Sequence, residues 1–243
     1  AHPLTVLTGL TAQNTVGVKR FEPCSADWID EQLQVLLDDG IAPSAIKTGV
    51  LGSTAAVAAV LKVKSLWPAV PLVVDPVRTS GRGDSFGGQA LFDSFRNELF
   101  PAVDLLTPNW PEAQAFTGAT TVDEAGARLL QMGCKAVLLK GGHLHGADSP
   151  DVLVSATETL WFEGKRINTA NTHGTGCSLA SAIATYLADG HDLSHAVAKG
   201  IAYVEAGLEA GVYLSIGQGS GPLWHMHAFY PTVLPDDIEP STS

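Results

Sequence analysis

Short apolar runs that alternate with longer helix-forming segments constrain the fold of this chain more than any other feature. Within these runs, polar and apolar residues do not alternate regularly. The runs are Leu4–Leu10, Ala45–Val50, Leu72–Asp75, Leu105–Thr107 and Ala136–Lys140. Continuous apolar strands are typical of a sheet that is covered on both faces. Because strand–helix–strand connections are right-handed, this alternation predicts an α/β fold, a three-layer α/β/α sandwich with a mainly parallel central sheet.

Helical patterns occupy the intervals between the apolar runs. They are Ala26–Asp38, Thr54–Ser65, Gln89–Leu99, Pro111–Phe116, Val122–Met132, Cys177–Ala188 and Leu193–Ala210. Near Val152–Phe162, two strand patterns follow each other without a helix, which predicts an antiparallel hairpin at one edge of the sheet. We expect residues 1–243 to form a single domain, with residues 232–243 as a tail.

Composition excludes several classes of protein. The chain has 243 residues, a net charge of −11 and a pI near 5.0 without a basic patch, so nucleic acid is not an expected partner. No apolar run approaches the roughly 20 residues of a membrane-spanning helix, so we expect no membrane association. Cys24, Cys134 and Cys177 are widely spaced and form no disulfide or zinc motif, which favours the reducing cytoplasm.

The residues that follow each predicted strand indicate where a ligand would bind. In parallel sheets, ligands bind beyond the carboxyl ends of the strands. The polar or glycine-rich strand ends are Thr11–Thr15, Gly49–Leu51, Asp75–Val77, Thr107–Asn109, Lys140–His143 and the turn at Gly174. We expect these segments to converge on one crevice.

The turn from Asn171 to Cys177 reads Asn-Thr-His-Gly-Thr-Gly-Cys and leads into an alanine-rich helix. Gly174 and Gly176 allow a ligand to approach backbone N–H groups closely, and the positive end of the helix points to the same place. The pattern predicts an anion hole, and a Cys177 thiol that the helix field biases toward thiolate. A phosphate held beside a candidate base indicates a phosphotransferase. A glycine-rich turn before a core cysteine is the alternative.

Other strand-end residues have two interpretations each. Asn109 and Glu112 either lie near Mg²⁺ or form a helix capping box without a ligand; capping is favoured, and the two are compatible. Asp75 either contacts a metal or ribose-like hydroxyls, or it forms a turn. Lys140 either neutralises phosphate charge or faces solvent. The Gln13 amide suits the edge of an aminopyrimidine or pyridine ring, or it is a polar loop residue.

Common nucleotide-binding signatures are missing from the sequence. No Walker A sequence occurs, which excludes the P-loop classes. In the stretch Gly174–Leu179, leucine occupies the place of the third small residue of the dinucleotide fingerprint, so a Rossmann oxidoreductase is only a distant alternative.

Five segments of the sequence carry a specific combined pattern: Leu10–Thr15, Thr107–Ala113, Met132–His143, Asn171–Cys177 and the ending Gly217–His225. In this order they resemble the ribokinase-like kinases, and among them the hydroxymethylpyrimidine/phosphomethylpyrimidine kinases of thiamine biosynthesis. The resemblance runs from about His2 to Tyr230. It implies ATP- and Mg²⁺-dependent phosphorylation of 4-amino-5-hydroxymethyl-2-methylpyrimidine and its monophosphate.

The resemblance also implies roles for individual residues. Gln13 would hydrogen-bond the pyrimidine, and Val50 would line its pocket, although methionine is common at the latter position. Cys177 would be the catalytic base, at the position where sugar kinases carry an aspartate, with Gly174, Thr175 and Gly176 as the anion hole. Lys140, Asn109 and Thr175 would lie near the nucleotide. Asn109 and Glu112 would organise Mg²⁺. Asp75 joins them as a candidate metal ligand because its carboxylate ends a strand, not because of the resemblance.

One departure from the family lies at the start of the sequence. The family opens with a strand and a Gly/Ser-rich loop, a unit of roughly 30 residues, which is absent here. We interpret this as an incomplete sequence rather than a degenerate protein, because loss of a central strand leaves backbone groups unpaired.

Two alternatives to the pyrimidine kinase stay open. A pyridoxal kinase shares the fold and the Gly-Thr-Gly turn, and a non-catalytic pyrimidine-binding relative would fit the missing unit. We also expect a homodimer, because dimer formation would cover an exposed edge hairpin.

Overall fold

A computed structural model describes residues 1–78, 86–143, 150–164 and 166–230. Its centre is a six-stranded sheet in the order β3-β4-β5-β6-β7-β8. The strands are β3 (Ile46–Thr48), β4 (Leu72–Val74), β5 (Leu105–Leu106), β6 (Ala136–Leu139), β7 (Asp151–Ser155) and β8 (Thr159–Phe162). Strands β3 to β6 are parallel, whereas β7 and β8 are antiparallel. The predicted parallel sheet and edge hairpin are therefore confirmed.

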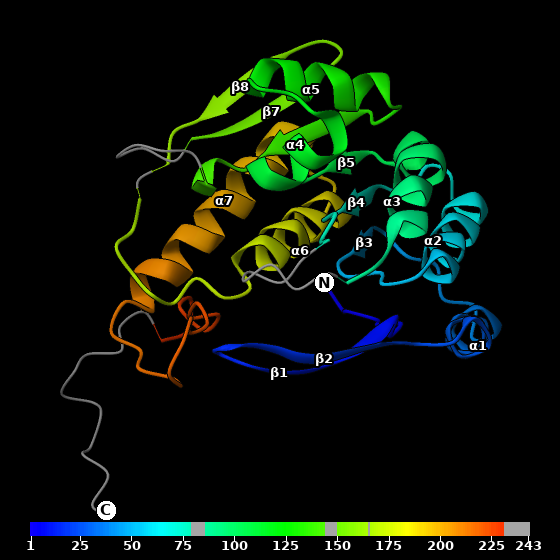
Figure 1. Ribbon diagram of the computed structural model, residues 1–243, viewed down its shortest axis with the longest axis horizontal. Helices are drawn as coiled ribbons and strands as arrows, with labels where there is room; N and C mark the ends of the chain where they lie inside the picture. Colours follow the sequence, from blue (N-terminus) through cyan, green and yellow to red (C-terminus); the bar gives the residue numbers. More distant parts are fainter. Residues whose placement is uncertain (79–85, 144–149, 165, 231–243) are drawn as a thin grey trace, which may run out of the picture.

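Helices cover both faces of this sheet (Figure 1). One layer contains α1 (Ala26–Asp38), α2 (Thr54–Leu66), α3 (Gln89–Ser94), α4 (Trp110–Thr117) and α5 (Val122–Gln131). The other layer contains α6 (Thr175–Ala188) and α7 (Leu193–Ala210). Helix α3 continues through a π-helical turn, Phe95–Leu99, into a 3₁₀ turn, Phe100–Ala102. A second 3₁₀ turn, Gly141–His143, follows β6. The predicted three-layer sandwich is confirmed.

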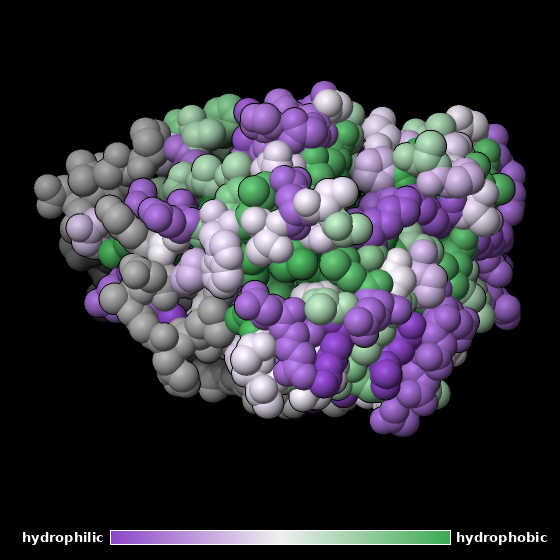
Figure 2. Space-filling model, turned by 90° about the horizontal axis from the view of Figure 1, so that it is seen from above, coloured by the Kyte–Doolittle hydropathy of each residue, from purple (hydrophilic) through white to green (hydrophobic). Residues whose placement is uncertain are grey.

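Successive residues of one strand pack into opposite layers. In β4, Leu72 and Val74 belong to the core with α1 to α5, whereas Val73 packs with α6 and α7. Both faces are therefore buried, which explains why the central strands read as continuous apolar runs. On the side of α5 and β8, hydrophobic residues reach the surface between polar ones (Figure 2). Trp161 of the edge strand β8 is among the exposed large hydrophobic residues.

The first apolar run does not form the strand that the sequence predicted. Strand β1 instead spans Gly9–Asn14 and pairs antiparallel with β2 (Gly17–Pro23) in a hairpin separate from the sheet. Leu4 and Leu7 are 48% and 47% exposed, whereas Val6 between them is partly buried against the core. Local hydrogen bonds stabilise the turn of this hairpin, because Asn14 Oδ1 accepts hydrogen bonds from the N–H groups of Val16 and Gly17.

This result corrects a second expectation. Residues 11–14, predicted as a loop after a strand, lie inside β1, and only Thr15 and Val16 form the turn. The expected tail at residues 232–243 lies outside the described residues. The assignment of residues 1–243 to one domain stays a prediction. Among the described residues, no helix is long and apolar enough to cross a membrane.

Lys64 is a buried lysine that joins α2 to the entry of two central strands. Its Nζ donates to two backbone carbonyls at 2.9 and 2.6 Å, and it pairs with Asp104 Oδ2 at 2.7 Å. Asp104 also accepts hydrogen bonds from the Leu72 N–H and the Lys135 ammonium. Burial opposes ionisation of Asp104, but the hydrogen bonds from Lys135, Lys64 and Leu72 outweigh it and lower its pKa.

Replacing Lys64 by methionine tests the weight of this network. The variant Lys64→Met leaves two carbonyls without a donor and removes one cation from Asp104, so we expect a loss of about 2–4 kcal/mol in the free energy of unfolding. The matched control is Lys62→Met on the same helix, which removes an exposed ion pair with Asp30 and should change stability by less than about 0.5 kcal/mol. Urea denaturation followed by circular dichroism measures both. Equal losses in the two variants would contradict the structural role of Lys64.

Candidate active site

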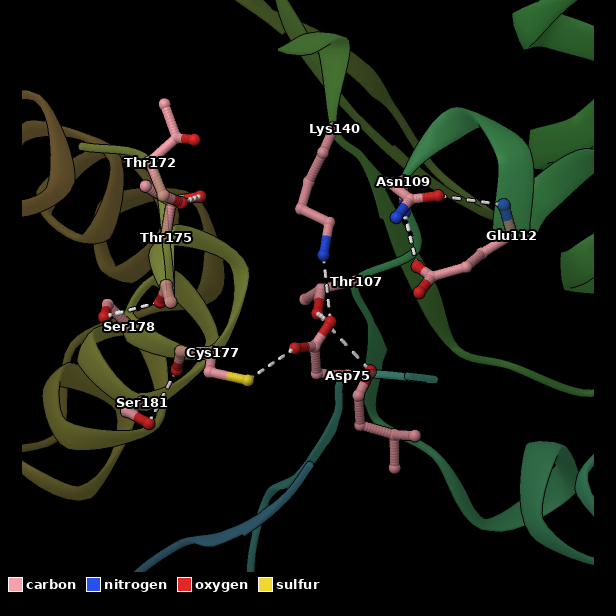
Figure 3. Close-up of polar contacts among 12 residues, drawn as sticks. Asp75, Thr107, Asn109, Glu112, Lys140, Thr172, Thr175, Cys177, Ser178 and Ser181 are labelled. Atoms are coloured by element: carbon pink, nitrogen blue, oxygen red, sulfur yellow. Dashed lines mark hydrogen bonds and ion pairs between the residues drawn. The ribbon is translucent and has the colours of Figure 1, made fainter. Parts of the chain in front are cut away.

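The polar residues that follow the parallel strands meet the start of α6 (Figure 3). Asp75 follows β4, Thr107 follows β5 and Lys140 follows β6. Cys177 and Gly176 approach the same point from the first turn of α6. The predicted convergence is thus confirmed for these residues.

Asp75 makes the contacts that hold this cluster together. It is only 2% exposed, and its Oδ1 accepts a hydrogen bond from Lys140 Nζ at 2.9 Å and one from Thr107 Oγ1 at 3.4 Å. Its Oδ2 accepts from Cys177 Sγ at 3.4 Å. Burial opposes protonation of Lys140, but the charges of Asp75 and Glu112 prevail and raise its pKa. Lys140 is therefore a cation, and it compensates the negative charge of the buried Asp75 carboxylate.

The protonation state of Cys177 differs from the expected one. The sequence predicted a thiol biased toward thiolate, but burial of the sulfur and the negative charge of Asp75 raise the pKa of Cys177. The nearby charges of Lys47 and Lys140 act in the opposite direction and are weaker. Although Cys177 is exposed as a residue, its Sγ points inward toward Asp75 (Figure 3). The resting group is therefore a thiol that donates to a carboxylate.

The glycine turn leaves an open cradle at the start of α6. Gly174 is the N-cap and has a φ of 81°, a conformation that favours glycine. The helix begins at Thr175, two residues earlier than expected, and Thr175 Oγ1 donates to the Thr172 carbonyl at 3.1 Å. The N–H groups of Gly176 and Cys177 donate to no acceptor within the described part of the chain. A Cβ on Gly176 would lie 3.0 Å from Lys140 Nζ, so glycine keeps this approach open.

Asn109 and Glu112 form the predicted capping box. Asn109 Oδ1 accepts from the Glu112 N–H at 2.9 Å, and Glu112 Oε2 accepts from the Asn109 N–H at 2.8 Å. Glu112 is 7% exposed. Its burial raises its pKa to about 7, against the opposing charge of Lys140 and with a smaller raising effect from Asp75.

Among the described residues, no group of three or more His, Cys, Asp or Glu side chains could hold a metal ion, but Glu112 keeps one oxygen available for a cation. The second carboxylate oxygen, Glu112 Oε1, accepts no hydrogen bond from the residues that the structure describes. A divalent cation would compensate the buried negative charge, and carboxylate and amide oxygens are ligands that Mg²⁺ prefers. The capping role therefore leaves Glu112 able to bind a metal.

Gln13 and Val50 lie outside the hydrogen-bonded cluster. Gln13 is exposed in β1, and its Nε2 lies 3.4 Å from Nε2 of His173 in the glycine turn. Val50 is half-buried, and its carbonyl accepts the Thr8 hydroxyl at 2.7 Å. Gln13 therefore reaches the glycine turn through His173. The pocket-lining role of Val50 stays a prediction.

Sequence reasoning assigned no individual role to three residues of this site. His173 contacts Gln13, Thr107 contacts Asp75, and Lys47 lies close enough to lower the pKa of Cys177. Lys47 carries a signal that was available, because a lysine inside an apolar strand pattern is unusual. Thr107 directly follows a buried strand, which is where polar site residues are expected. His173 has no distinguishing signal beyond its place in the glycine turn.

Alkylation of Cys177 tests the contact with Asp75. Because the Asp75 charge raises the thiol pKa, Asp75→Asn should lower it and increase the rate of modification by iodoacetamide at pH 7.5 by roughly tenfold. Mass spectrometry of the Cys177 peptide, with EDTA present, measures the rate. The control Asp189→Asn, at the exposed far end of α6, should leave it unchanged.

The wild-type pH profile gives a reading that does not depend on a variant. With a raised pKa, the alkylation rate of Cys177 should still be rising at about pH 8.5, the ordinary pKa of a free thiol. A plateau below pH 8 would show that the thiol is activated, and it would contradict the assigned contact.

Comparison with known proteins identifies relatives of this chain. The family model described as phosphomethylpyrimidine kinase matches residues 1–224. The thiamine biosynthesis bifunctional protein ThiED of Geobacter sulfurreducens is 39% identical over 229 residues; the match covers 92% of this chain and 46% of that protein, so the chain spans about half its length. The hydroxymethylpyrimidine/phosphomethylpyrimidine kinase of Salmonella typhimurium is 36% identical over 236 residues, with 95% and 88% covered.

Solved structures give the same relationship. The crystal structure of phosphomethylpyrimidine kinase from Clostridium difficile 630 superposes with a TM-score of 0.71 at 33% identity, and the match covers 83% of this chain and 84% of that one. Pyridoxal kinase from Staphylococcus aureus, in complex with AMP-PCP and pyridoxal, superposes with a TM-score of 0.79 at 25% identity, with 90% and 81% covered. The predicted ribokinase-like fold and the family resemblance are confirmed: the chain is a kinase that belongs to the phosphomethylpyrimidine kinase family.

Proposed function

We propose that this chain transfers the γ-phosphoryl group of ATP to 4-amino-5-hydroxymethyl-2-methylpyrimidine, and then to its monophosphate, in thiamine biosynthesis. The observation that carries the proposal is the cluster of Asp75, Lys140 and Cys177, which faces the open N-terminus of α6. The substrate is that named for the Salmonella relative. ATP is proposed because the Staphylococcus aureus neighbour binds AMP-PCP, an ATP analogue.

The cradle supplies positive charge where a phosphoryl group carries negative charge. The N–H groups of Gly176 and Cys177, which have no acceptor in the described ranges, point into it together with the positive end of α6. Gly174 and Thr175 shape its entrance. Lys140 Nζ lies beside it without an intervening Cβ. In phosphoryl transfer, such positioning and charge stabilisation provide most of the catalysis.

Cys177 is the proposed base for the attacking hydroxyl. Its Sγ lies at the rim of the cradle and donates to Asp75 Oδ2 in the resting state. Because the thiol pKa is raised, the ionised fraction that can accept a proton increases with pH. We therefore expect kcat to rise with pH above 7 in the wild-type chain.

Glu112, Asn109 and Asp75 are the residues that would hold Mg²⁺, with Asn109 and Thr175 close to the nucleotide phosphates. When bound, the ion would neutralise phosphate charge. Asp75 already pairs with Lys140 and Cys177, so its part in metal binding depends on a rearrangement of those contacts. Glu112 has an oxygen that accepts no hydrogen bond from the described residues, and it is the stronger candidate.

The ring of the substrate is assigned to Gln13 and Val50. The Gln13 amide carries a donor and an acceptor side by side, as the edge of an aminopyrimidine does. A pyridoxal kinase remains the alternative because the Staphylococcus aureus pyridoxal kinase shares the fold. The pyrimidine is favoured because identity to the Salmonella pyrimidine kinase is 36%, against 25% to that pyridoxal kinase. A non-catalytic relative that only binds the pyrimidine is the other alternative.

Two further expectations stay predictions. A homodimer is proposed because β8 is an edge strand of the sheet with Trp161 exposed on it. A cytoplasmic location is proposed from the unpaired cysteines, which the structure describes as free thiols.

Turnover of the two ring alcohols separates the candidate functions. Release of ADP, measured in parallel with hydroxymethylpyrimidine and with pyridoxal, should give a kcat/KM at least about tenfold higher for the pyrimidine. The reverse preference would make the chain a pyridoxal kinase. Calorimetric binding of the pyrimidine without turnover of either alcohol would identify the non-catalytic relative.

Substitution of Cys177 tests the assigned base. Cys177→Ala should lower kcat by about 10²-fold or more, the usual scale for a positioned base, and should remove the rise of kcat with pH. Cys24→Ala, a change at a partly buried thiol before α1, is the matched control and should leave kcat unchanged. Wild-type turnover in Cys177→Ala would remove Cys177 from the mechanism.

A further inference from the structure

A glycine-rich segment, Gly217–Gly221, lies against the tip of the β1–β2 hairpin (Figure 1); we call it the glycine strap. The N–H groups of Gln218 and Gly219 both donate to Thr15 Oγ1, at 3.1 and 3.2 Å. The N–H of Ser220 donates to the Thr15 carbonyl at 2.9 Å. One threonine at the hairpin turn therefore accepts three backbone hydrogen bonds from the strap.

The other side of the strap binds the turn that leads into α6. The Gly221 carbonyl accepts the N–H of His173 at 2.9 Å, and His173 forms a parallel bridge with Pro222. Ser220 Oγ lies 3.1 Å from Thr172 Oγ1, within hydrogen-bonding distance. The strap therefore connects the hairpin tip with the glycine turn of the anion cradle.

The glycine strap packs closely against Thr15 on one side and Asn171 on the other. A Cβ on Gly219 would lie 2.0 Å from the Thr15 carbonyl oxygen, and a Cβ on Gly221 would lie 2.0 Å from Asn171 Oδ1. Gly217 has a φ of 72°, and its Cβ would lie 2.3 Å from Thr15 Oγ1. The contact at Gly219 is with backbone atoms and cannot be relieved by a change of rotamer. The contacts at Gly217 and Gly221 are with side-chain oxygens, and the positive φ of Gly217 favours glycine in addition.

The strap connects the two elements that the proposed function assigns to substrate binding, which are the β1–β2 hairpin and the glycine turn before α6. Gln13 lies two residues before Thr15 on the hairpin, and it meets His173 of the turn at 3.4 Å. We propose that Thr15 is a positioning residue, which holds the ring-binding hairpin against the phosphate-binding turn through the glycine strap. Thr15 acts on the site through the strap. Within the described chain, it makes no hydrogen bond to the cradle residues Gly176, Cys177 and Lys140.

Because this inference rests on the proposed function, its main test separates substrate positioning from chemistry. Thr15→Val keeps the shape of the side chain and removes the oxygen that accepts two N–H groups. With whichever ring alcohol the wild type phosphorylates, we expect KM for that alcohol to rise at least about fivefold while kcat changes less than about twofold. Thr15→Ser keeps the hydroxyl and should restore the wild-type KM. An unchanged KM in Thr15→Val, or an equal defect in Thr15→Ser, would overturn the proposal.

Hydrogen exchange gives a reading that needs no substrate. In Thr15→Val, exchange should become faster at the N–H of Gln218 and Gly219, and also at the N–H of His173, which bonds the strap but not Thr15. Faster exchange at His173 shows that the hairpin tip and the turn are coupled. A change limited to the two strap amides would overturn the coupling. If the wild type phosphorylates neither alcohol, the proposed function is wrong. The hydrogen-exchange experiment then tests the role of Thr15 by itself.

A steric variant checks the same coupling from the strap. Gly219→Ala places a methyl group against the Thr15 backbone and should raise KM at least as much as Thr15→Val. Gly88→Ala is the control, because a Cβ there meets nothing within 4 Å. Similar effects of Gly219→Ala and Gly88→Ala would overturn the positioning role of the strap.

Discussion

The buried ion pair between Asp75 and Lys140 is the interaction on which the arrangement of the site depends. It joins the carboxyl ends of β4 and β6 across β5, and Thr107 at the end of β5 contacts the same carboxylate. The register of the parallel strands places these side chains on the same face of the sheet. A shift of one strand by one residue would turn its side chains to the opposite face. Removing either charge would leave the other buried and unpaired, which costs several kcal/mol.

The chemistry of Cys177 follows from the same carboxylate. The N-terminus of α6 brings the thiol to within 3.4 Å of Asp75. Burial of the sulfur, together with the negative charge that fixes Lys140, raises the pKa of Cys177 and keeps it protonated at rest. The absent side chain at Gly176 lets the ammonium of Lys140 approach the cradle. A cation, a thiol and two backbone N–H groups that have no acceptor among the described residues therefore face one point.

Sequence reasoning succeeded where the information is local. Buried strands read as apolar runs, and the polar residues that end them, Asp75 and Lys140, lie together because parallel strands end at one edge. The capping box of Asn109 and Glu112 was likewise readable from three-residue spacing.

The predictions that failed depend on contacts distant in sequence. The apolar run at Leu4 has the composition of a core strand, but composition does not reveal whether a layer exists to bury it. The helix field at Cys177 was visible in the sequence, whereas the opposing charge of Asp75 lies 102 residues away. The contact between Thr15 and Gly219 spans 204 residues, and no spacing rule predicts it.

Phosphorus NMR of the purified chain with ATP, Mg²⁺ and hydroxymethylpyrimidine tests the central claim most directly. We predict that the resonance of a phosphate monoester appears as ATP is consumed, followed by the resonances of a diphosphate. Consumption of the pyrimidine without a second phosphorylation would limit the activity to the first step. Unchanged ATP and pyrimidine, with a folded chain of the correct mass, would contradict the assignment of this site to phosphoryl transfer on the pyrimidine.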